Sequence, residues 1–269
     1  MITSSSNQQM KNLTALLKKS RERREQDAFV VEGPKMFYEA PRAWIRQVYV
    51  SEAYHKDADN AARLAAFCEE DEDHRIFYEV VADSVFKAVS DTQTPQGILA
   101  VLSQPHYAFS DLLQGDKTHL LLLENIQDPG NLGTMVRTGE GAGITGIIMS
   151  RETVDLFNPK TIRSTMGSIY RMPFYVAENL EETIEDLHKQ GLQLYAAHLK
   201  GTLSYEEPDY TGPCGFLIGN EGNGLSDAIA DAADTYIRIP MEGQVESLNA
   251  AISATLLMYE CNRQRRQKS

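Results

Sequence analysis

Three short segments of this sequence combine glycines with amide, carboxylate and guanidinium side chains, the residue types that position ligands and move protons. They are residues 125–138, 219–226 and 239–249, which read NIQDPGNLGTMVRT, GNEGNGLS and IPMEGQVESLN. Each follows or ends a short apolar run of the kind that forms a buried strand. In open α/β sheets, ligands bind beyond the carboxyl ends of the strands. We therefore expect the three segments to converge on one crevice.

The first segment has the features of an anion site. A Gly-rich loop from Asp128 to Gly133 leads into a helix predicted over residues 134–141, and backbone N–H groups at such a junction bind anions. Arg137 is expected just over one turn into that helix, on the ligand side, where it would suit a phosphate. Loop glycines and a surface arginine without a ligand are the alternative. No G-x-G-x-x-G leads into this helix and no G-x-x-x-x-G-K-[ST] occurs, so dinucleotide and nucleotide-triphosphatase sites are not indicated.

The other two segments each allow a structural and a functional interpretation. Glu221 follows an apolar strand, and burying its carboxylate without a partner would be costly. It therefore lies either in an exposed turn or in a place where a partner holds it. Ser247 is a good N-cap for a helix predicted over residues 247–263, which is the structural interpretation of that serine. Asn249 then has no evident structural role in the first turn.

The second half of the chain alternates strands and helices. The run His119 to Ile126 is largely apolar, as expected for a strand that is buried on both faces. Further strands are predicted at 146–150, 192–197, 215–218 and 236–239. Further helices are predicted at 158–167, with Pro159 in the first turn, and at 225–233. This pattern predicts a parallel α/β domain.

The first half has a weaker α/β pattern. Met10, Leu13, Leu16 and Leu17 recur at helical spacing, which predicts a helix over residues 10–25. Predicted strands at 29–32, 47–51 and 76–81 enclose a helix from Pro34 through Tyr38 and another at 58–70. Pro105 and Gly115 then interrupt the pattern. We predict an N-terminal domain over residues 1–105, a linker at 106–117 and a second domain over 118–269.

Charge is unevenly distributed along the 269 residues. The net charge of −12 taken alone argues against a nucleic-acid partner. Residues 1–50, however, hold nine Lys or Arg against five Asp or Glu, and the tail from Asn262 to Ser269 is basic. A solvated basic face is one interpretation of these charges, and an RNA contact is the other. The densest basic cluster is formed by Lys18, Lys19, Arg21, Arg23 and Arg24.

The pattern of apolar residues and of cysteines indicates the cellular compartment. The chain lacks an apolar run of about 18 residues, and its first nine residues are polar, so neither a membrane span nor a signal peptide is expected. The three cysteines have neither metal-ligand spacing nor the pattern of a disulfide framework. We therefore expect a cytoplasmic protein with no metal and no membrane partner.

Taken together, the three polar segments resemble the three signature motifs of the SpoU (TrmH-like) RNA 2'-O-ribose methyltransferases, which belong to the SPOUT class. The resemblance covers about residues 118–262, and Asn158-Pro159-Lys160 with Arg163 and Gly167 also looks like the family. The first hundred residues resemble, more loosely, the RNA-binding domain similar to a ribosomal protein that many members carry. The resemblance implies a parallel α/β catalytic domain with a trefoil knot, a homodimer with the site near the subunit interface, and S-adenosylmethionine as cofactor.

The resemblance also implies a reaction, in which a ribose 2'-hydroxyl attacks the methyl group of S-adenosylmethionine. Arg137 would lie nearest the hydroxyl and bind the adjacent phosphate; because a guanidinium barely deprotonates, phosphate-assisted proton removal is the easier route. Asn131 would orient the arginine or the ribose, and Glu221 would order the loop or hold Arg137. Ser247 and Asn249 would shape the pocket. The cofactor would be held by Gly219, Ile239, Met241 and Leu248.

The substrate implied by the resemblance is structured RNA, with ribosomal RNA favoured over transfer RNA. The cluster of Lys18, Lys19, Arg21, Arg23 and Arg24 would bind it through phosphates. The alternatives are a transfer-RNA ribose methyltransferase and a non-catalytic RNA-binding or ribosome-assembly factor that keeps the fold. A small-molecule α/β enzyme is a further alternative, but it would leave the basic N-terminal segment unexplained.

Overall fold

The computed structural model describes residues 1–71 and 75–268. The chain divides into two compact units. The first unit comprises Met1–His106 and Phe157–Tyr170, and the second comprises Tyr107–Leu156 and Arg171–Ser269. The structure thus groups residues 157–170 with the first unit, whereas the sequence pattern placed them in the second domain.

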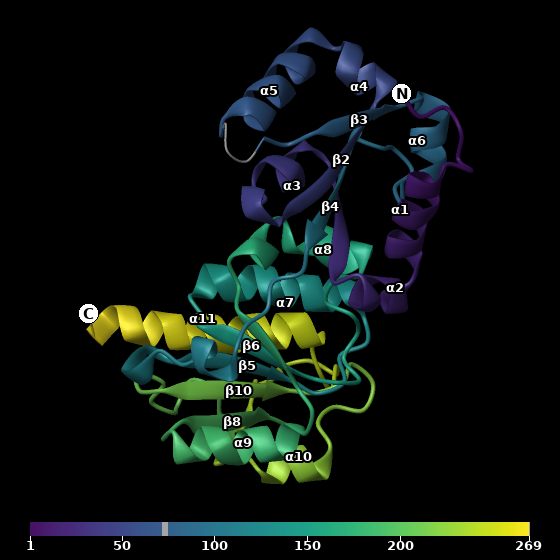
Figure 1. Ribbon diagram of the computed structural model, residues 1–269. Coiled ribbons are helices and arrows are strands. Elements are labelled where there is room, and N and C mark those ends of the chain that lie inside the picture. Colours follow the sequence, from purple (N-terminus) through teal and green to yellow (C-terminus); the bar gives the residue numbers. More distant parts are fainter. Residues whose placement is uncertain (72–74, 269) are drawn as a thin grey trace. The chain divides into compact units, whose positions relative to one another are not determined.

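The first unit is built on a four-stranded sheet of order β1-β4-β2-β3 (Figure 1). β4 pairs antiparallel with β1 and β2, whereas β2 and β3 are parallel. Its strands are β1 (Ala28–Glu32), β2 (Ile45–Ser51), β3 (Tyr78–Val81) and β4 (Ile98–Ser103). Its helices are α1 (Gln8–Lys18), α2 (Ser20–Glu25), α3 (Pro34–Tyr38), α4 (Glu52–Lys56), α5 (Ala58–Glu69), α6 (Asp83–Val89) and α8 (Pro159–Thr165), with 3₁₀ turns η1 (Arg42–Trp44) and η4 (Ser168–Tyr170).

Helices cover both faces of this sheet. Apolar residues of α1 and α6 form one buried cluster with side chains of β1, β2 and β4. On the other side, the ring of Phe29 lies 4.8 Å from that of Phe157, the residue before α8. The hydroxyl of Tyr170 donates to the backbone carbonyl of Met36 at 2.7 Å. Residues 157–170 therefore complete the core of the first unit.

The second unit is built on a seven-stranded parallel sheet of order β7-β6-β5-β10-β8-β11-β9. Its strands are β5 (His119–Leu123), β6 (Gly146–Ser150), β7 (Phe174–Ala177), β8 (Gln193–Ala197), β9 (Leu203–Ser204), β10 (Cys214–Ile218) and β11 (Thr235–Arg238). Its helices are α7 (Pro129–Ala142), α9 (Leu180–Lys189), α10 (Asp227–Asp231) and α11 (Ala250–Lys268), with 3₁₀ turns η2 (Phe109–Leu112) and η3 (Gly115–Lys117). The predicted parallel α/β fold is confirmed.

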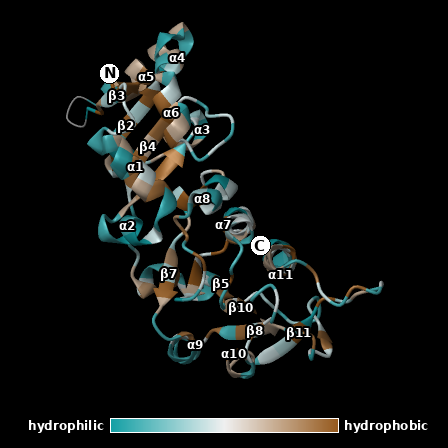
Figure 2. Ribbon diagram, turned by 90° about the vertical axis from the view of Figure 1, so that its right-hand side faces the viewer, coloured by the Kyte–Doolittle hydropathy of each residue, from teal (hydrophilic) through white to brown (hydrophobic). Residues whose placement is uncertain are grey.

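Helices α7 and α11 cover one face of the seven-stranded sheet, and α9 and α10 cover the other (Figures 1 and 2). Figure 2 shows brown, hydrophobic strands with largely teal helix surfaces in both units. β5 is buried along its whole length, as predicted for the run at 119–126, and β6 and β10 are buried along their whole length as well. In the part of the chain that the structure describes, none of the helices has the length and apolar character needed to cross a membrane.

The sheet order brings two of the polar segments together. β5 and β10 are parallel neighbours with Leu123 opposite Ile218, so the segments that follow them leave the sheet side by side. β10 in turn neighbours β8, and β8 neighbours β11, whose end precedes the third segment. The predicted convergence at the carboxyl edge of the sheet is therefore confirmed for the strands that carry the segments.

Three predicted elements differ from the structure. The prediction of a Gly-rich loop at 128–133 is wrong, because α7 begins at Pro129. The Asp128 side chain caps α7 by accepting from the backbone N–H of Asn131. The predicted helix at 10–25 is interrupted at Lys19, whose backbone is extended. α11 begins at Ala250 rather than 247. Helices α4, α6 and α9 and strands β4, β7 and β9 were not predicted.

Arg23 differs from the other members of the basic cluster. Only 3% of its surface is exposed, whereas Lys18, Lys19, Arg21 and Arg24 are exposed. Its guanidinium donates to the backbone carbonyls of Leu16 and Leu17 at 2.6 and 3.2 Å, near the end of α1. These carbonyls lack a partner within the helix, so Arg23 acts as a cap. We therefore withdraw Arg23 from the predicted RNA contacts.

We predict that Arg23→Ala lowers the free energy of unfolding by about 1–3 kcal/mol, because it leaves buried backbone carbonyls without a donor. Urea denaturation of the full chain measures this change. Arg24→Ala, which removes an exposed arginine from the same helix, is the matched control and should change stability by less than about 0.5 kcal/mol. Equal effects of the two substitutions would contradict the capping role.

Candidate active site

A chain of hydrogen bonds joins all three polar segments. The Glu221 carboxylate accepts from the side-chain amide of Asn131 at 3.0 Å, and the Asn131 carbonyl oxygen accepts from the side-chain amide of Asn249 at 3.0 Å. Glu221 also accepts from the backbone N–H groups of Gln127 and Asp128, at 3.0 and 3.1 Å. Of the two roles that the sequence left open for Glu221, these contacts favour ordering the loop.

Asn249 has a structural role that the sequence did not indicate. Its side-chain oxygen accepts from the backbone N–H groups of Ala251 and Ile252, at 2.9 and 3.3 Å. Asn249 is therefore the cap of α11, and the expectation that Ser247 caps this helix is wrong. Because the Asn249 oxygen serves α11, its amide nitrogen is free to donate to Asn131. Ser247 is exposed and lines the cavity described below.

The loop after β10 is closed by hydrogen bonds between its two ends, next to Gly219. The backbones of Asn220 and Gly224 exchange two hydrogen bonds, and the Asn220 side-chain oxygen accepts from the backbone N–H groups of Gly222 and Asn223. A Cβ atom on Gly219 would come within 2.1 Å of the backbone of Gly224. Only glycine permits this approach, so Gly219 allows the loop to close against the end of β10 at the edge of the cavity.

A second network ties the ends of three neighbouring strands. Asn125 adopts a left-handed backbone conformation, with φ of 55°. Its side-chain oxygen and its backbone N–H both bond to the hydroxyl of Ser150, at 2.8 and 2.9 Å. The Asn220 amide donates to the Asn125 carbonyl at 2.8 Å. The ends of β5, β6 and β10 are thereby held in a fixed relation.

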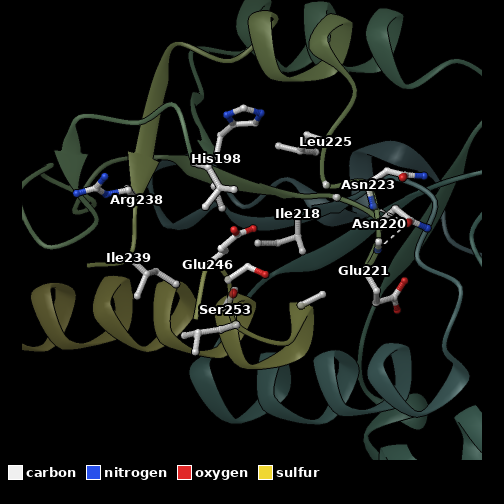
Figure 3. A pocket seen from close by; sticks show the side chains of 18 of the residues that line it. His198, Ile218, Asn220, Glu221, Asn223, Leu225, Arg238, Ile239, Glu246 and Ser253 are labelled. Atoms are coloured by element: carbon white, nitrogen blue, oxygen red, sulfur yellow. Dashed lines mark hydrogen bonds between the residues drawn. The ribbon is translucent and has the colours of Figure 1, made fainter. Parts of the chain in front are cut away.

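A cavity of about 320 Å³ opens at the carboxyl ends of β8, β10 and β11. In Figure 3, Asn220, Glu221 and Asn223 lie at one side, Arg238 and Ile239 lie at the other, and Ile218 lies between them. All four residues predicted to hold the cofactor line this cavity: Gly219, Ile239, Met241 and Leu248. Glu221 and Ser247 from the predicted catalytic set line it as well. Its size suits a small organic ligand.

Arg137 lies on α7, two turns after its start, because the helix begins earlier than predicted. The side chain is exposed, and within residues 1–71 and 75–268 it has neither a hydrogen-bond nor an ion-pair partner. It does not line the cavity of Figure 3. Asn131, in the first turn of the same helix, bonds to Glu221 and Asn249 instead. The exposed guanidinium is thus available to an anionic ligand.

The hydrogen bonds of Glu221 determine its charge. Burial acts to raise the pKa of this carboxyl, but donation from the Asn131 side chain and from the backbone N–H groups of Gln127 and Asp128 outweighs that effect. The net pKa lies below its usual value, so Glu221 is ionised at neutral pH. A fixed negative charge therefore holds the N–H groups of the loop that leads into α7.

Sequence reasoning did not assign several residues that shape the site. Asn125, Ser150 and Asn220 were part of the motifs or strands but received no role. Glu124 is 9% exposed and accepts from the backbone N–H of Ser226 at 2.7 Å, which fixes the far end of the loop after β10. A carboxylate directly after four leucines was the one available signal, since such a group must be paired if it is buried.

Two family models match the chain. The model of the SpoU rRNA Methylase family matches residues 118–259, and the model of the MRM3-like substrate binding domain matches residues 7–100. The first match covers the parallel sheet and all three polar segments. The second falls within the first unit.

Relatives match over nearly the full chain. The 23S rRNA (guanosine(2553)-2'-O)-methyltransferase RlmP of Bacillus subtilis (strain 168) is 31% identical, over 96% of this chain and 97% of its own. An AdoMet-bound rRNA methyltransferase from Sinorhizobium meliloti is 30% identical with a TM-score of 0.85, over 97% of each chain. AdoMet-bound AviRb from Streptomyces viridochromogenes is 25% identical with a TM-score of 0.85, over 97% of this chain and 98% of its own. The chain therefore belongs to the SpoU family of RNA methyltransferases.

Proposed function

We propose that this protein transfers a methyl group from S-adenosylmethionine to a ribose 2'-hydroxyl of ribosomal RNA. The observation that carries the proposal is the hydrogen-bonded chain Glu221–Asn131–Asn249, which joins the three polar segments beside the cavity. The relative RlmP acts on 23S rRNA, and two similar structures bind AdoMet. Ribosomal RNA is accordingly favoured over transfer RNA and over a purely structural role.

The cavity residues fit S-adenosylmethionine. Gly219 lines the cavity, and because it has no side chain the backbone of Gly224 can close the loop that forms this wall. Ile239, Met241 and Leu248 provide apolar surface in the lining of the cavity. When bound, the sulfonium group supplies the methyl group that is transferred. Ser247 and Ser253 supply hydroxyl groups that can hold polar groups of the ligand.

Arg137 is proposed to bind the phosphate next to the reacting ribose. A guanidinium has only donors and stays charged, so it orients the phosphate and is not itself a base. The oriented phosphate oxygen then takes the proton of the 2'-hydroxyl. Asn131 and Glu221 have a positioning role. They hold the start of α7, the helix that carries Arg137, against the loop after β10. These groups contribute by positioning and by proton transfer.

The finer features of the family are proposed here as well. The knot is supported by the sheet order, because β10 follows β8 in sequence but inserts between β5 and β8. A homodimer is supported by α11, where Ile252 and Tyr259 are 50% and 45% exposed and Leu256 lies between them on the same helical face. We place the active site near that interface. The first unit is proposed to resemble a ribosomal protein.

The first unit is proposed to bind the RNA substrate. Lys18, Lys19, Arg21 and Arg24 are exposed at the junction of α1 and α2, within the range that matches the substrate binding domain model. We also propose a cytoplasmic setting, since Cys68, Cys214 and Cys261 are free thiols in the structure.

We predict that Arg137→Ala reduces methyl transfer to ribosomal RNA by about 10²–10⁴-fold, because phosphate binding and proton removal are both lost. The dissociation constant for S-adenosylmethionine, measured by calorimetry, should stay unchanged, since Arg137 does not line the cavity. The control is Arg171→Ala. Arg171 lies just before β7 and forms an ion pair with Glu140. Wild-type turnover by Arg137→Ala would sink the proposed role.

We predict that Glu221→Gln destabilises the protein in a pH-dependent way. Because the folded pKa of Glu221 is lowered, its stabilising effect is complete above the unfolded value of about 4.3. That effect is lost as the pH falls through the lower, folded pKa. The difference in unfolding free energy between wild type and variant should therefore be constant at neutral pH and shrink below about pH 4.

Urea denaturation at a series of pH values measures this difference. Glu178→Gln, which removes an exposed carboxylate paired with Arg151, is the control and should show a small difference throughout. A Glu221→Gln difference that grows on acidification would have the wrong sign for the proposed linkage.

We predict that replacing Lys18, Lys19, Arg21 and Arg24 with glutamine reduces the salt dependence of RNA binding. Each phosphate contact that is lost lowers the slope of log K against log[salt] by about 0.7–0.9. Filter binding of a ribosomal RNA fragment over a range of KCl concentrations measures the slope. Lys56→Gln, on α4 of the same unit, is the control. An unchanged slope for the fourfold variant would place the RNA elsewhere.

A further inference from the structure

Three buried side chains that can ligate a metal meet in the second unit, away from the polar segments. His119 begins β5, Cys214 begins β10, and Cys261 lies on α11. His119 and Cys214 are register partners in parallel strands, so their side chains leave the same face of the sheet, where α11 packs. Their exposed fractions are 1%, 1% and 0%. One ring nitrogen of His119 and the two sulfurs lie within 4.8 Å of one another.

The distance between the sulfurs suits a tetrahedral metal. Two thiolates at about 2.3 Å from a zinc ion, separated by the tetrahedral angle, place their sulfurs about 3.8 Å apart. The sulfurs of Cys214 and Cys261 are 3.8 Å apart in the structure. An imidazole nitrogen in the same site would lie about 3.5 Å from each sulfur, so His119 needs to move by about one ångström to ligate.

His119 carries an unexplained polar atom in this cluster. Within the described part of the chain, its Nε2 is buried and has no hydrogen-bond partner. Leaving such an atom unpaired costs about 1–3 kcal/mol. The ring of Phe216 packs edge-on against the imidazole, with centroids 5.7 Å apart, and apolar packing alone leaves that nitrogen unsatisfied. A cation bound to Nε2 would supply the missing partner.

Groups around the cluster support thiolate ligands. Nη2 of Arg265 lies 3.6 Å from the Cys214 sulfur and shares its two N–H groups between that sulfur and the backbone carbonyls of Thr118 and Gly212, while Nε donates to the Tyr210 carbonyl. Hydrogen bonds of this kind orient metal ligands from outside the coordination shell. The Tyr210 carbonyl oxygen lies 3.5 Å from the Cys261 sulfur and 3.8 Å from the Cys214 sulfur. It is the group placed to complete a fourth position.

We propose that His119, Cys214 and Cys261 form a site for one thiophilic divalent cation of the Zn²⁺ class. On binding, both thiols lose their protons to solution, and the contact between the sulfurs is replaced by two sulfur–metal bonds. The cation joins the starts of β5 and β10 to α11. These strand starts lie at the opposite edge of the sheet from the polar segments. The site therefore stabilises the catalytic unit and takes no part in methyl transfer.

The wide spacing of the three ligands in the chain explains why no metal site was predicted. The three residues are far apart in the chain, and no two of them lie within a few residues of each other. Zinc sites are read from sequence through closely spaced ligand pairs. Here, strand pairing and helix packing bring the ligands together instead.

Cobalt(II) titration of the full, chelator-treated protein under reductant tests the proposal. Thiolate ligation gives an ultraviolet sulfur-to-cobalt charge-transfer band, which we expect to saturate at one equivalent per chain and to be displaced by Zn²⁺. Cys261→Ser should weaken Zn²⁺ binding by about 100-fold or more, since loss of an outer-shell partner alone costs 10–100-fold. Zn²⁺ should raise the melting temperature of wild type but not of Cys261→Ser.

Cys68→Ser is the matched control, because Cys68 is buried in the first unit and belongs to no such cluster among the described residues. It should keep both the cobalt band and the Zn²⁺ affinity. Absence of the band in folded wild type overturns the proposal without reference to any variant. So does Zn²⁺ binding that survives in Cys214→Ser/Cys261→Ser, or a Cys214–Cys261 disulfide that forms under air with no metal binding when it is reduced.

Discussion

The carboxylate of Glu221 makes the contact on which the candidate site depends. It joins the loop after β10 to the start of α7 across 90 to 94 residues of sequence, through the side chain of Asn131 and two backbone N–H groups. Because β5 and β10 are parallel neighbours, these segments meet without distortion of the sheet. Asn249 then connects α11 to the same point. One ionised carboxylate thus aligns the elements that carry the proposed RNA and cofactor contacts.

The position of this contact separates two tasks. On one side of Glu221 lies the cavity lined by Gly219, Ile239 and Leu248, which fits the cofactor. On the other side lies α7, whose exposed Arg137 has no partner within the described residues and is free to meet a phosphate. A group that holds both sides with a fixed charge limits the loss of entropy when two substrates must be aligned.

Much of the second unit could be predicted from sequence, because buried parallel strands are continuous apolar runs and their polar ends stand out. The motif order indicated the family and the cofactor. The predicted helix starts and caps were wrong where the local sequence was compatible with two structures. Asp128 and Pro129 begin a helix whose start the glycines of the same segment led us to predict at residue 134, and Asn249 caps α11 in place of Ser247. The burial of Arg23 depends on how α2 folds back on α1, which charge spacing does not reveal.

The central claim is ribose methylation of ribosomal RNA. It is tested most directly by transfer of tritiated methyl groups from S-adenosylmethionine to deproteinised ribosomal RNA that lacks the modification, followed by alkaline hydrolysis. A 2'-O-methyl group blocks cleavage of the adjacent phosphodiester, so the account predicts that the label is recovered in an alkali-resistant dinucleotide. Label recovered in single nucleotides with a methylated base, or none in ribosomal RNA while transfer RNA is labelled, would contradict it.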